Sequence, residues 1–188
     1  MKTNTTIVLT PTLWRTCRAL AGPTRLNLLR RIIEKPDQCV TDLAAAEEVS
    51  ESRASQELRR LQSRGLVQMY RTGTWTRYRP VTDPKVVSAK PLLAAMRKAL
   101  VRWSDEKTRR VAHAFGHERR LKLVQLMQEG RRSLDEFQEQ GNLSRPALFR
   151  HIAVLQEGGV IQRVPGGWEL RANPHPLAKA MLALLRTT

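Results

Sequence analysis

The sequence predicts a mostly helical α+β protein in which one arrangement of elements occurs twice. The segment SESRASQELRRLQSRGLV, residues 50–67, has a counterpart about ninety residues later in SRPALFRHIAVLQEGGV, residues 144–160. Both segments begin with serine, carry apolar residues at helical spacing and end at a glycine followed by an aliphatic residue. A second pair, RLNLLRRI at residues 25–32 and RLKLVQLM at residues 120–127, precedes them. These repeats predict two similar units within 188 residues.

Each unit is predicted to begin with four helices. An apolar stripe (Leu13–Leu20, then Val111–Phe115) comes before a helix over the RLxL motif and a short third helix at 41–47 or 133–139. Ser50 and Ser144 are typical N-cap residues for the fourth helix. Gly65 and Gly159 favour its termination, because glycine adopts the left-handed conformation that ends many helices.

After the fourth helix, both units turn to residues that favour strands. The stretches Val67–Arg79 and Val160–Arg171 have strand-forming residues on either side of glycine-containing turns, which predicts hairpins. A last helix follows, at Pro91–Trp103 and at Pro176–Leu185. Four helices, a hairpin and a helix make a winged helix-turn-helix unit. We expect a first winged-helix domain at 1–90, a linking helix at 91–107 and a second winged-helix domain at 108–188.

The charge of the chain indicates a polyanionic partner. There are 33 Lys and Arg and 17 Asp and Glu, a net charge of +16. Residues 1–90 hold 16 basic and 8 acidic residues, and residues 91–188 hold 17 and 9. Each half therefore carries the same excess, as expected of two folded units that both face a nucleic acid. A tail of basic residues would not give this distribution.

The motifs in LAGPTRLNLLRRI and VSESRASQELRRLQSRGLV resemble those of the arsenic-repressor (ArsR) family of bacterial regulators, as does LSRPALFRHIAVLQEGGVI. The resemblance covers roughly residues 11–80 and 108–172. It implies a winged helix-turn-helix regulator that binds operator DNA as a homodimer, joined through its first and last helices. We therefore expect a sequence-specific DNA-binding transcriptional regulator of repressor type.

This chain departs from the family pattern because the motif occurs twice in it, as a tandem repeat. Its outer helices, near Leu13–Leu20, Leu92–Trp103, Val111–Phe115 and Leu177–Leu185, are apolar on one face. If they pack together, one polypeptide forms an intrachain pseudo-dimer that holds two recognition helices at a fixed spacing. Further self-association of the chain stays open.

A recognition helix contacts base edges with its N-terminal residues and phosphates with its flanks. In the first unit we expect the core to hold Ala54, Leu58 and Leu61, so the residues expected to contact DNA are Ser52, Arg53, Ser55, Gln56 and Arg59. Glutamine matches adenine and arginine matches guanine or phosphate. In the second unit the corresponding residues are Ser144, Arg145 and Arg150, beside Pro146 and Phe149. Phe149 could touch a thymine methyl or another protein, so base recognition by this helix stays open.

The predicted wings add Arg71 and Arg77 in the first unit and Arg163 in the second, since wing arginines bind the minor groove or phosphates. Trp75 and Trp168 are more typical of packing residues.

Metal sensing and catalysis find little support. Cys39 stands where many family members have a Cys-x-Cys metal pair, but the second position is Thr41. One thiolate and one hydroxyl make a poor site for thiophilic metals. His113 and His117 are spaced by one helical turn, and two ligands are too few; His175 stands alone. A redox pair of Cys17 and Cys39 is a minor alternative to buried apolar thiols. We expect no metal, no cofactor and no enzyme activity.

Two other function classes stay open: a winged-helix scaffold for protein assembly, and an RNA-binding module. Membrane association is disfavoured, because no apolar stretch reaches the ~18 residues of a membrane span. The N-terminal MKTNTTIVLTPTLW lacks an adequate signal-peptide core, and two cysteines do not make a disulfide framework. The sequence therefore predicts a cytoplasmic protein.

Overall fold

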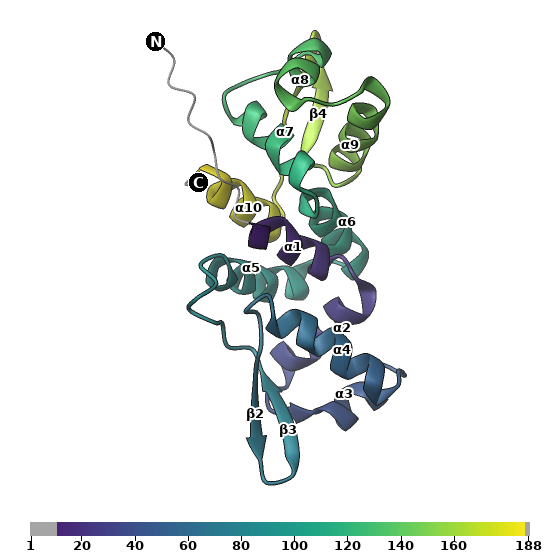
Figure 1. The fold of residues 1–188 in the computed structure, drawn as a ribbon, viewed down its shortest axis with the longest axis vertical. Coiled ribbons are helices and arrows are strands. Elements are labelled where there is room, and N and C mark those ends of the chain that lie inside the picture. Colours follow the sequence, from purple (N-terminus) through teal and green to yellow (C-terminus); the bar gives the residue numbers. More distant parts are fainter. Residues whose placement is uncertain (1–10, 187–188) are drawn as a thin grey trace.

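The structure, a computed structural model, describes residues 11–186. The N-terminal stretch MKTNTTIVLT, part of the segment in which we expected no signal peptide, lies outside these residues. The molecule is elongated, with helices and a hairpin at each end and a layer of four helices, α1, α5, α6 and α10, between them (Figure 1). No helix of the described range is long and apolar enough to cross a membrane.

Residues 11–102 of the described range form five helices and one small sheet. The helices are α1 (Pro11–Leu20), α2 (Pro23–Glu34), α3 (Val40–Ala46), α4 (Glu51–Gln62) and α5 (Ala89–Arg102). The strands are β1 (Gln38–Cys39), β2 (Gln68–Thr72) and β3 (Trp75–Arg79), in the antiparallel order β1-β3-β2. The predicted helices and the predicted hairpin are confirmed. The short strand β1, which joins the edge of the hairpin, was not predicted.

The remaining residues repeat this order of elements. The helices are α6 (Asp105–Phe115), α7 (Glu118–Gln128), α8 (Leu134–Gly141), α9 (Arg145–Glu157) and α10 (Pro176–Arg186), and β4 (Ile161–Val164) pairs with β5 (Gly167–Leu170). An isolated bridge between Arg132 and Trp168 stands where the first half has β1. Helix α5 ends at Arg102, so the expected linking helix at 91–107 is interrupted. Ser104 caps the next helix, α6, by accepting a hydrogen bond from the Lys107 amide.

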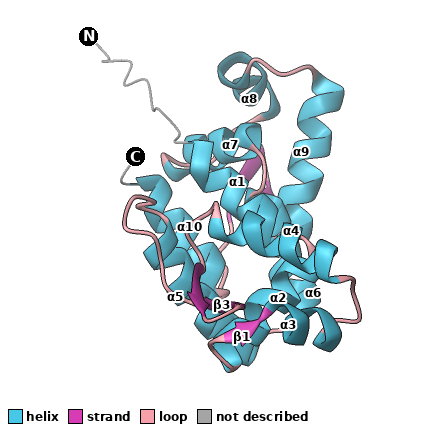
Figure 2. Cartoon of the chain, turned by 60° about the horizontal axis from the view of Figure 1, so that its bottom comes forward, coloured by secondary structure: helices cyan, strands magenta, loops and turns pink. Residues whose placement is uncertain are grey.

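The central layer is made of equivalent helices from the two halves. Helix α1 packs against α6, and α5 packs against α10, which also contacts α6 (Figures 1 and 2). The buried apolar side chains form one continuous core through this layer. Arg30 of α2 adds an ion pair with Asp105 of α6 and a hydrogen bond to the Leu100 carbonyl. The two ends of the molecule are therefore joined by packing and by polar contacts.

The cysteines occupy different elements and both are free thiols. Cys17 is fully buried in α1, where its Sγ lies 3.3 Å from Sδ of Met181 in α10, and burial raises the pKa of its thiol. Cys39 lies in β1, at the N-cap of α3. Cys17 thus packs as an apolar group of the central layer.

Two glycines explain where the fourth helix of each half ends. Gly65 has φ +70° and Gly159 has φ +66°, in the left-handed region that favours glycine. A side chain at Gly65 would also place its Cβ 2.9 Å from Cβ of Val86. The chain can therefore turn directly from the helix into the hairpin only with glycine at this position.

Candidate nucleic-acid interface

Helix α4 has one buried and one exposed face, as the sequence predicted. Ala54, Leu58 and Leu61 are fully buried against the core. The exposed residues include four of the five expected to contact DNA, Ser52, Arg53, Gln56 and Arg59, while Ser55 is half-buried. Ser50 caps the helix, because its Oγ accepts a hydrogen bond from the Arg53 amide at 3.2 Å. A fixed N-terminus and free polar side chains suit a helix that enters a groove of DNA.

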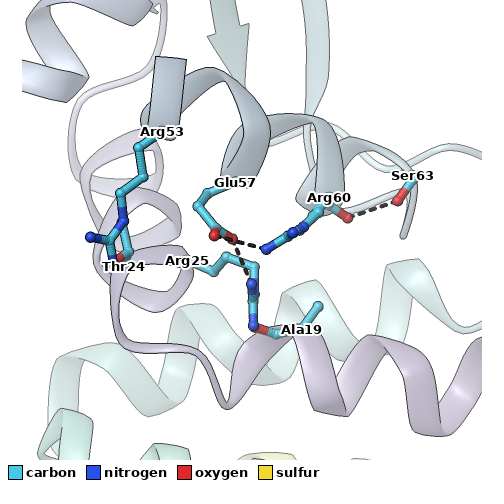
Figure 3. A network of polar contacts seen from close by, with 7 residues as sticks. All are labelled: Ala19, Thr24, Arg25, Arg53, Glu57, Arg60 and Ser63. Carbon is cyan, nitrogen blue, oxygen red and sulfur yellow. Dashed lines mark hydrogen bonds and ion pairs between the residues drawn. The ribbon is translucent and has the colours of Figure 1, made fainter. Parts of the chain in front are cut away.

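A polar network holds α4 on α2 (Figure 3). The Arg25 guanidinium donates to the Ala19 carbonyl at 2.6 Å and pairs with Glu57 at 2.5 Å. The other oxygen of Glu57 accepts from Arg60 at 2.9 Å. Both side chains of the Arg25–Glu57 pair are mostly buried. The Arg25–Glu57 pair therefore fixes the orientation of α4. This pair was not predicted from the spacing of residues in the sequence.

Gly22 makes room for this network. A Cβ at that position would lie 2.3 Å from Nη2 of Arg25, so any side chain would displace the guanidinium. On the other flank, Arg53 lies near α2 and donates to Oγ1 of Thr24 at 3.3 Å (Figure 3). The Arg59 side chain has no hydrogen bond or ion pair within the part of the chain that the structure describes, so its guanidinium is available to a partner.

The first wing extends from the body of the molecule as a two-stranded ribbon (Figure 1). Thr72 pairs with Trp75, so Gly73 and Thr74 form the turn, with φ +59° at Gly73. Arg71 is exposed near the tip. Trp75 is 53% exposed, so our interpretation of it as a packing residue is wrong. Its place at the tip, beyond the reach of the core, explains the exposure.

Side-chain contacts stiffen the base of this wing. Arg77, expected to contact DNA, is half-buried and donates to the Asp37 carbonyl at 2.7 Å. The Tyr70 hydroxyl donates to the Asp37 carboxylate at 2.5 Å, a bond that raises the pKa of the phenol. Arg79 stacks over the Tyr70 ring with 5.0 Å between guanidinium carbon and ring centroid. Of the two wing arginines we named in this half, Arg71 is the free one and Arg77 anchors the wing.

Helix α9 presents a different surface. Ser144 is its N-cap but makes no capping hydrogen bond with its side chain, and Pro146 lies in the first turn. Arg145 is engaged with α8, where it donates to Gln138 at 2.8 Å and pairs with Asp135 at 3.2 Å. Arg150 is exposed. Phe149 is 50% exposed, so this helix offers an aromatic ring where α4 offers Ser55.

The second wing is shorter and closer to the body. Trp168 is buried and packs near Phe137, with 6.4 Å between ring centroids, which confirms the packing interpretation. Arg163 lies over the Trp168 ring at 5.8 Å. Gly167, with φ +156°, allows a close approach, since a Cβ there would lie 2.1 Å from the Arg132 carbonyl oxygen. This wing is tied to the loop before α8.

His113 and His117, the two histidines spaced four residues apart, belong to different helices. His113 belongs to α6, whereas His117 is the N-cap of α7 and its Nδ1 accepts from the Arg119 amide at 3.1 Å. Our expectation of one shared helical turn is therefore wrong, because α6 ends at Phe115. Within residues 11–186 no three His, Cys, Asp or Glu side chains come together as metal ligands would. Thr41, beside Cys39, is exposed.

His175 is buried at the start of α10. Its Nδ1 accepts from the Leu177 amide at 3.2 Å, and its Nε2 lies 3.2 Å from Oγ1 of Thr108. Burial, and to a smaller extent the charge of Lys107, lowers the pKa of this imidazole to about 4. His175 therefore acts as a neutral capping group that joins α10 to α6.

A basic cavity lies beside the C-terminal end of α4. It measures about 470 Å³, and its lining includes Trp14, Arg15 and Arg18 of α1, Arg25 of α2, and Arg60 and Arg64 from the end of α4 and the turn after it. Arg15 lies over the Trp14 ring at 5.2 Å. The positive surface of α4 thus continues onto the central layer.

Comparison with known proteins gives a match over part of the chain. Residues 22–69 match the family model described as "Bacterial regulatory protein, arsR family". A putative arsenical resistance operon repressor of Halobacterium salinarum is 43% identical over 70 residues, which are 37% of this chain and 59% of that protein. A transcriptional repressor SmtB homolog of Synechocystis is 49% identical over 55 residues, 29% of this chain and 41% of that protein.

The chain thus spans between two fifths and three fifths of the length of these curated relatives. The matched segment begins at Gly22 and ends in β2, so it contains α2, α3 and the exposed helix α4. The helix-turn-helix part of the first half is therefore similar to the arsR family of bacterial regulatory proteins.

Proposed function

We propose that the protein is a sequence-specific DNA-binding transcriptional repressor, in which α4 enters the major groove of operator DNA. The observation that carries this proposal is the exposed polar face of α4, where Arg53, Gln56 and Arg59 project from a helix that the Arg25–Glu57 pair holds in place. Arginine and glutamine have the donors and acceptors that distinguish guanine and adenine in the major groove. Ser52 and Ser55 complete the contact surface.

The charge and the comparisons support the same function. A net charge of +16 favours binding to a polyanion. The relatives similar to residues around α4 are named as repressors, and neither name is that of an enzyme. The proposal includes a cytoplasmic location and does not include an enzyme activity.

The packing of the central layer supports a further element of the proposal, an intrachain pseudo-dimer. Equivalent helices meet there, α1 with α6 and α5 with α10. In this arrangement residues 1–90 form the first winged-helix domain, 91–107 the linking segment and 108–188 the second domain. The two recognition helices, α4 and α9, would then approach one duplex at a fixed spacing.

The two recognition helices have unequal roles in this proposal. In the first half, α4 supplies base recognition, Arg71 contacts the duplex from the wing, and Arg77 contacts DNA near the base of the wing that it anchors. The second half contacts mainly phosphates in this proposal. Arg145 is held by α8 and Arg163 by Trp168, so neither side chain is free to reach a base edge. The residues that contact phosphates are Ser144, Arg145, Arg150 and Arg163.

Duplex binding measured against salt concentration tests this function. The double variant Arg53→Ala/Arg59→Ala should bind random and specific duplexes more weakly and lower the salt slope by about one for each phosphate contact that is lost. The matched control is Lys90→Ala/Lys98→Ala, which removes two exposed charges from α5. Equal losses in both variants, or a shallow slope for the unmodified chain, would contradict the proposal.

One observation favours a second candidate function, a scaffold for another protein. Phe149 is 50% exposed near the N-terminal end of α9, where a base-contacting helix would carry polar groups. A scaffold should bind duplex DNA weakly and RNA no better, so the same salt series distinguishes it from a DNA-binding protein or an RNA-binding module.

A further inference from the structure

An arginine at the same position of each half has different partners in the two halves. Arg25 and Arg120 occupy the same place in the two RLxL motifs, and each donates from Nε to a carbonyl six residues earlier, Ala19 at 2.6 Å and Ala114 at 2.7 Å. Arg120 also donates to the His113 carbonyl at 2.6 Å. The two guanidinium groups thus have the same position at the end of the preceding helix.

The partner on the recognition helix differs. Arg25 meets the carboxylate of Glu57 (Figure 3), whereas the residue at the corresponding place of α9, 94 positions later, is His151. Arg120 is 6% exposed and forms no ion pair with any acidic side chain in the described residues. A buried charge without a counter-ion is costly, and the two carbonyl groups supply only partial negative charge.

The surroundings of Arg120 add positive charge. The ring of His151 lies 4.8 Å from that of His117, between centroids, and His117 in turn lies 6.5 Å from Trp14 of α1. The charged groups that act on the two imidazoles are Arg18 of α1, Glu118, Arg119 and Arg120 of α7, and Arg150 of α9. Glu118 is the single acid in this set, so the site repels metal cations and attracts anions.

The two histidines offer donors to such an anion. Because Nδ1 of His117 accepts the Arg119 amide, its proton lies on Nε2. The imidazole of His151 makes no hydrogen bond within the described residues, and Nη1 of Arg120 makes none either. Both histidines are half-buried, so solvent reaches the site.

We propose that Arg120, His117 and His151 form a binding site for a small oxyanion of the phosphate or sulfate type, which supplies the negative charge that Glu57 supplies in the first half. The oxyanion accepts hydrogen bonds from the guanidinium and the two imidazoles, and Arg18 and Arg119 add attraction from the rim. This site is separate from the exposed face of α4, so it stands or fails independently of the proposed base recognition.

The site should bind more tightly at lower pH. Burial and the neighbouring positive charges lower the pKa of both imidazoles, that of His151 to about 4. A bound anion favours their protonated forms and raises these pKa values, so binding is linked to proton uptake. Sulfate keeps its charge between pH 5 and 8, and we expect it to bind about tenfold more tightly at pH 5.5 than at pH 7.5.

The test compares sulfate binding by the full chain with that of His151→Glu, which gives Arg120 the partner that Arg25 has. Sodium sulfate should raise the Tm of the unmodified chain by about 3–5 °C at ten times Kd, beyond the effect of sodium chloride at equal ionic strength. The variant should be more stable without sulfate and show only the general stabilisation that sulfate gives any protein.

Two further variants keep the test decisive. His151→Gln replaces the imidazole by a neutral amide and should lose most of the sulfate response. This variant tests the site even if His151→Glu fails to fold. Glu57→His removes the counter-ion from Arg25 and should leave the sulfate response of the second half unchanged. Equal sulfate responses in the unmodified chain, His151→Glu and His151→Gln would overturn the proposal.

Duplex DNA distinguishes the source of the oxyanion. If the site takes a free anion, His151→Glu leaves the salt slope of duplex binding unchanged. If a backbone phosphate occupies it, the variant lowers that slope by about one. Both results support an oxyanion site, and the sulfate titration alone decides whether it exists.

Discussion

The two halves of the chain share an order of elements but differ in what their fourth helices present. Helix α4 has exposed Arg53, Gln56 and Arg59 and is fixed through Glu57 to a buried arginine. Helix α9 has exposed Phe149 and, in place of that glutamate, His151. The positions that face the core are apolar in both helices. Folding therefore constrains the buried face, and the two exposed faces are free to take different roles.

The largest effect that separates the halves should follow from removing their different arginine partners. Glu57→Ala leaves Arg25 mostly buried without a counter-ion, and we expect a loss of about 2–3 kcal/mol in the free energy of unfolding. His151→Ala removes no counter-ion and should cost less than about 1 kcal/mol. Urea unfolding of the two variants measures both values. Equal losses would show that the Arg25–Glu57 pair does not stabilise the first half.

Acid should weaken the second half before the first, because all four histidines lie after residue 108. The pKa of His175 is lowered by burial to about 4 from an ordinary value near 6.5. Its contribution to stability is therefore present above pH 6.5 and is lost as the pH falls toward 4, by about 2–3 kcal/mol.

Hydrogen exchange at pH 7 and pH 5 measures this difference. The amides of α10 and α6 should lose protection at the lower pH, whereas those of α4 should keep it. His175→Asn, which can retain a capping acceptor without titrating, is the control and should flatten the pH dependence. Parallel loss of protection in α4 and α10 would contradict this prediction.

Substitutions in α4 should affect base recognition more than substitutions in α9. Gln56→Ala should cost about 1–3 kcal/mol at one base position and relax specificity there. Phe149→Ala, at the exposed face of α9, should change specificity little. Competition binding with single-base variants of the selected site compares them. A larger loss of specificity for the α9 variant would reverse the assignment of the two helices.

Phosphate contact should be the main role of α9. Arg150→Ala is expected to weaken binding to all duplexes alike and to lower the salt slope by about one. The measurement is duplex affinity at several salt concentrations, with Lys179→Ala, an exposed charge on α10, as the matched control. A base-specific effect of Arg150→Ala would instead show that α9 reads sequence.

No effect on metal binding is expected from Cys39, the thiol beside the third helix of the first half. Neither half has a Cys-x-Cys pair near its third helix, since Thr41 stands two residues after Cys39 and the second half has Ser133 at the position of Cys39. Cys39→Ala should therefore leave zinc and cadmium binding, and DNA affinity in the presence of these ions, unchanged. Stoichiometric metal binding that is lost in the variant would contradict this.

The order of elements could be predicted from local signals. Ser50 caps α4, Ser144 occupies the N-cap position of α9, Gly65 and Gly159 follow the ends of these helices, and apolar spacing placed the buried face of α4 correctly. These features depend on residues close together in the chain.

Contacts between distant segments could not be predicted in this way. The Arg25–Glu57 pair joins residues 32 apart, and the His117–His151 contact joins residues 34 apart. The place of Trp75 at the wing tip depends on the length of the hairpin, and our interpretation of it as a packing residue was wrong. Whether an arginine is free, as Arg59 is, or engaged, as Arg77 and Arg145 are, likewise depends on tertiary contacts.

The most direct test of unequal recognition helices is selection of bound sequences from a random duplex pool by the full chain. We predict a selected DNA site made of two adjacent half-sites. One half-site has a well-defined sequence, and Gln56→Ala relaxes the preference for it. The other half-site has a constant length but little sequence preference. A symmetric palindrome whose two halves tolerate the same base substitutions would contradict this account and show that α4 and α9 read DNA equally.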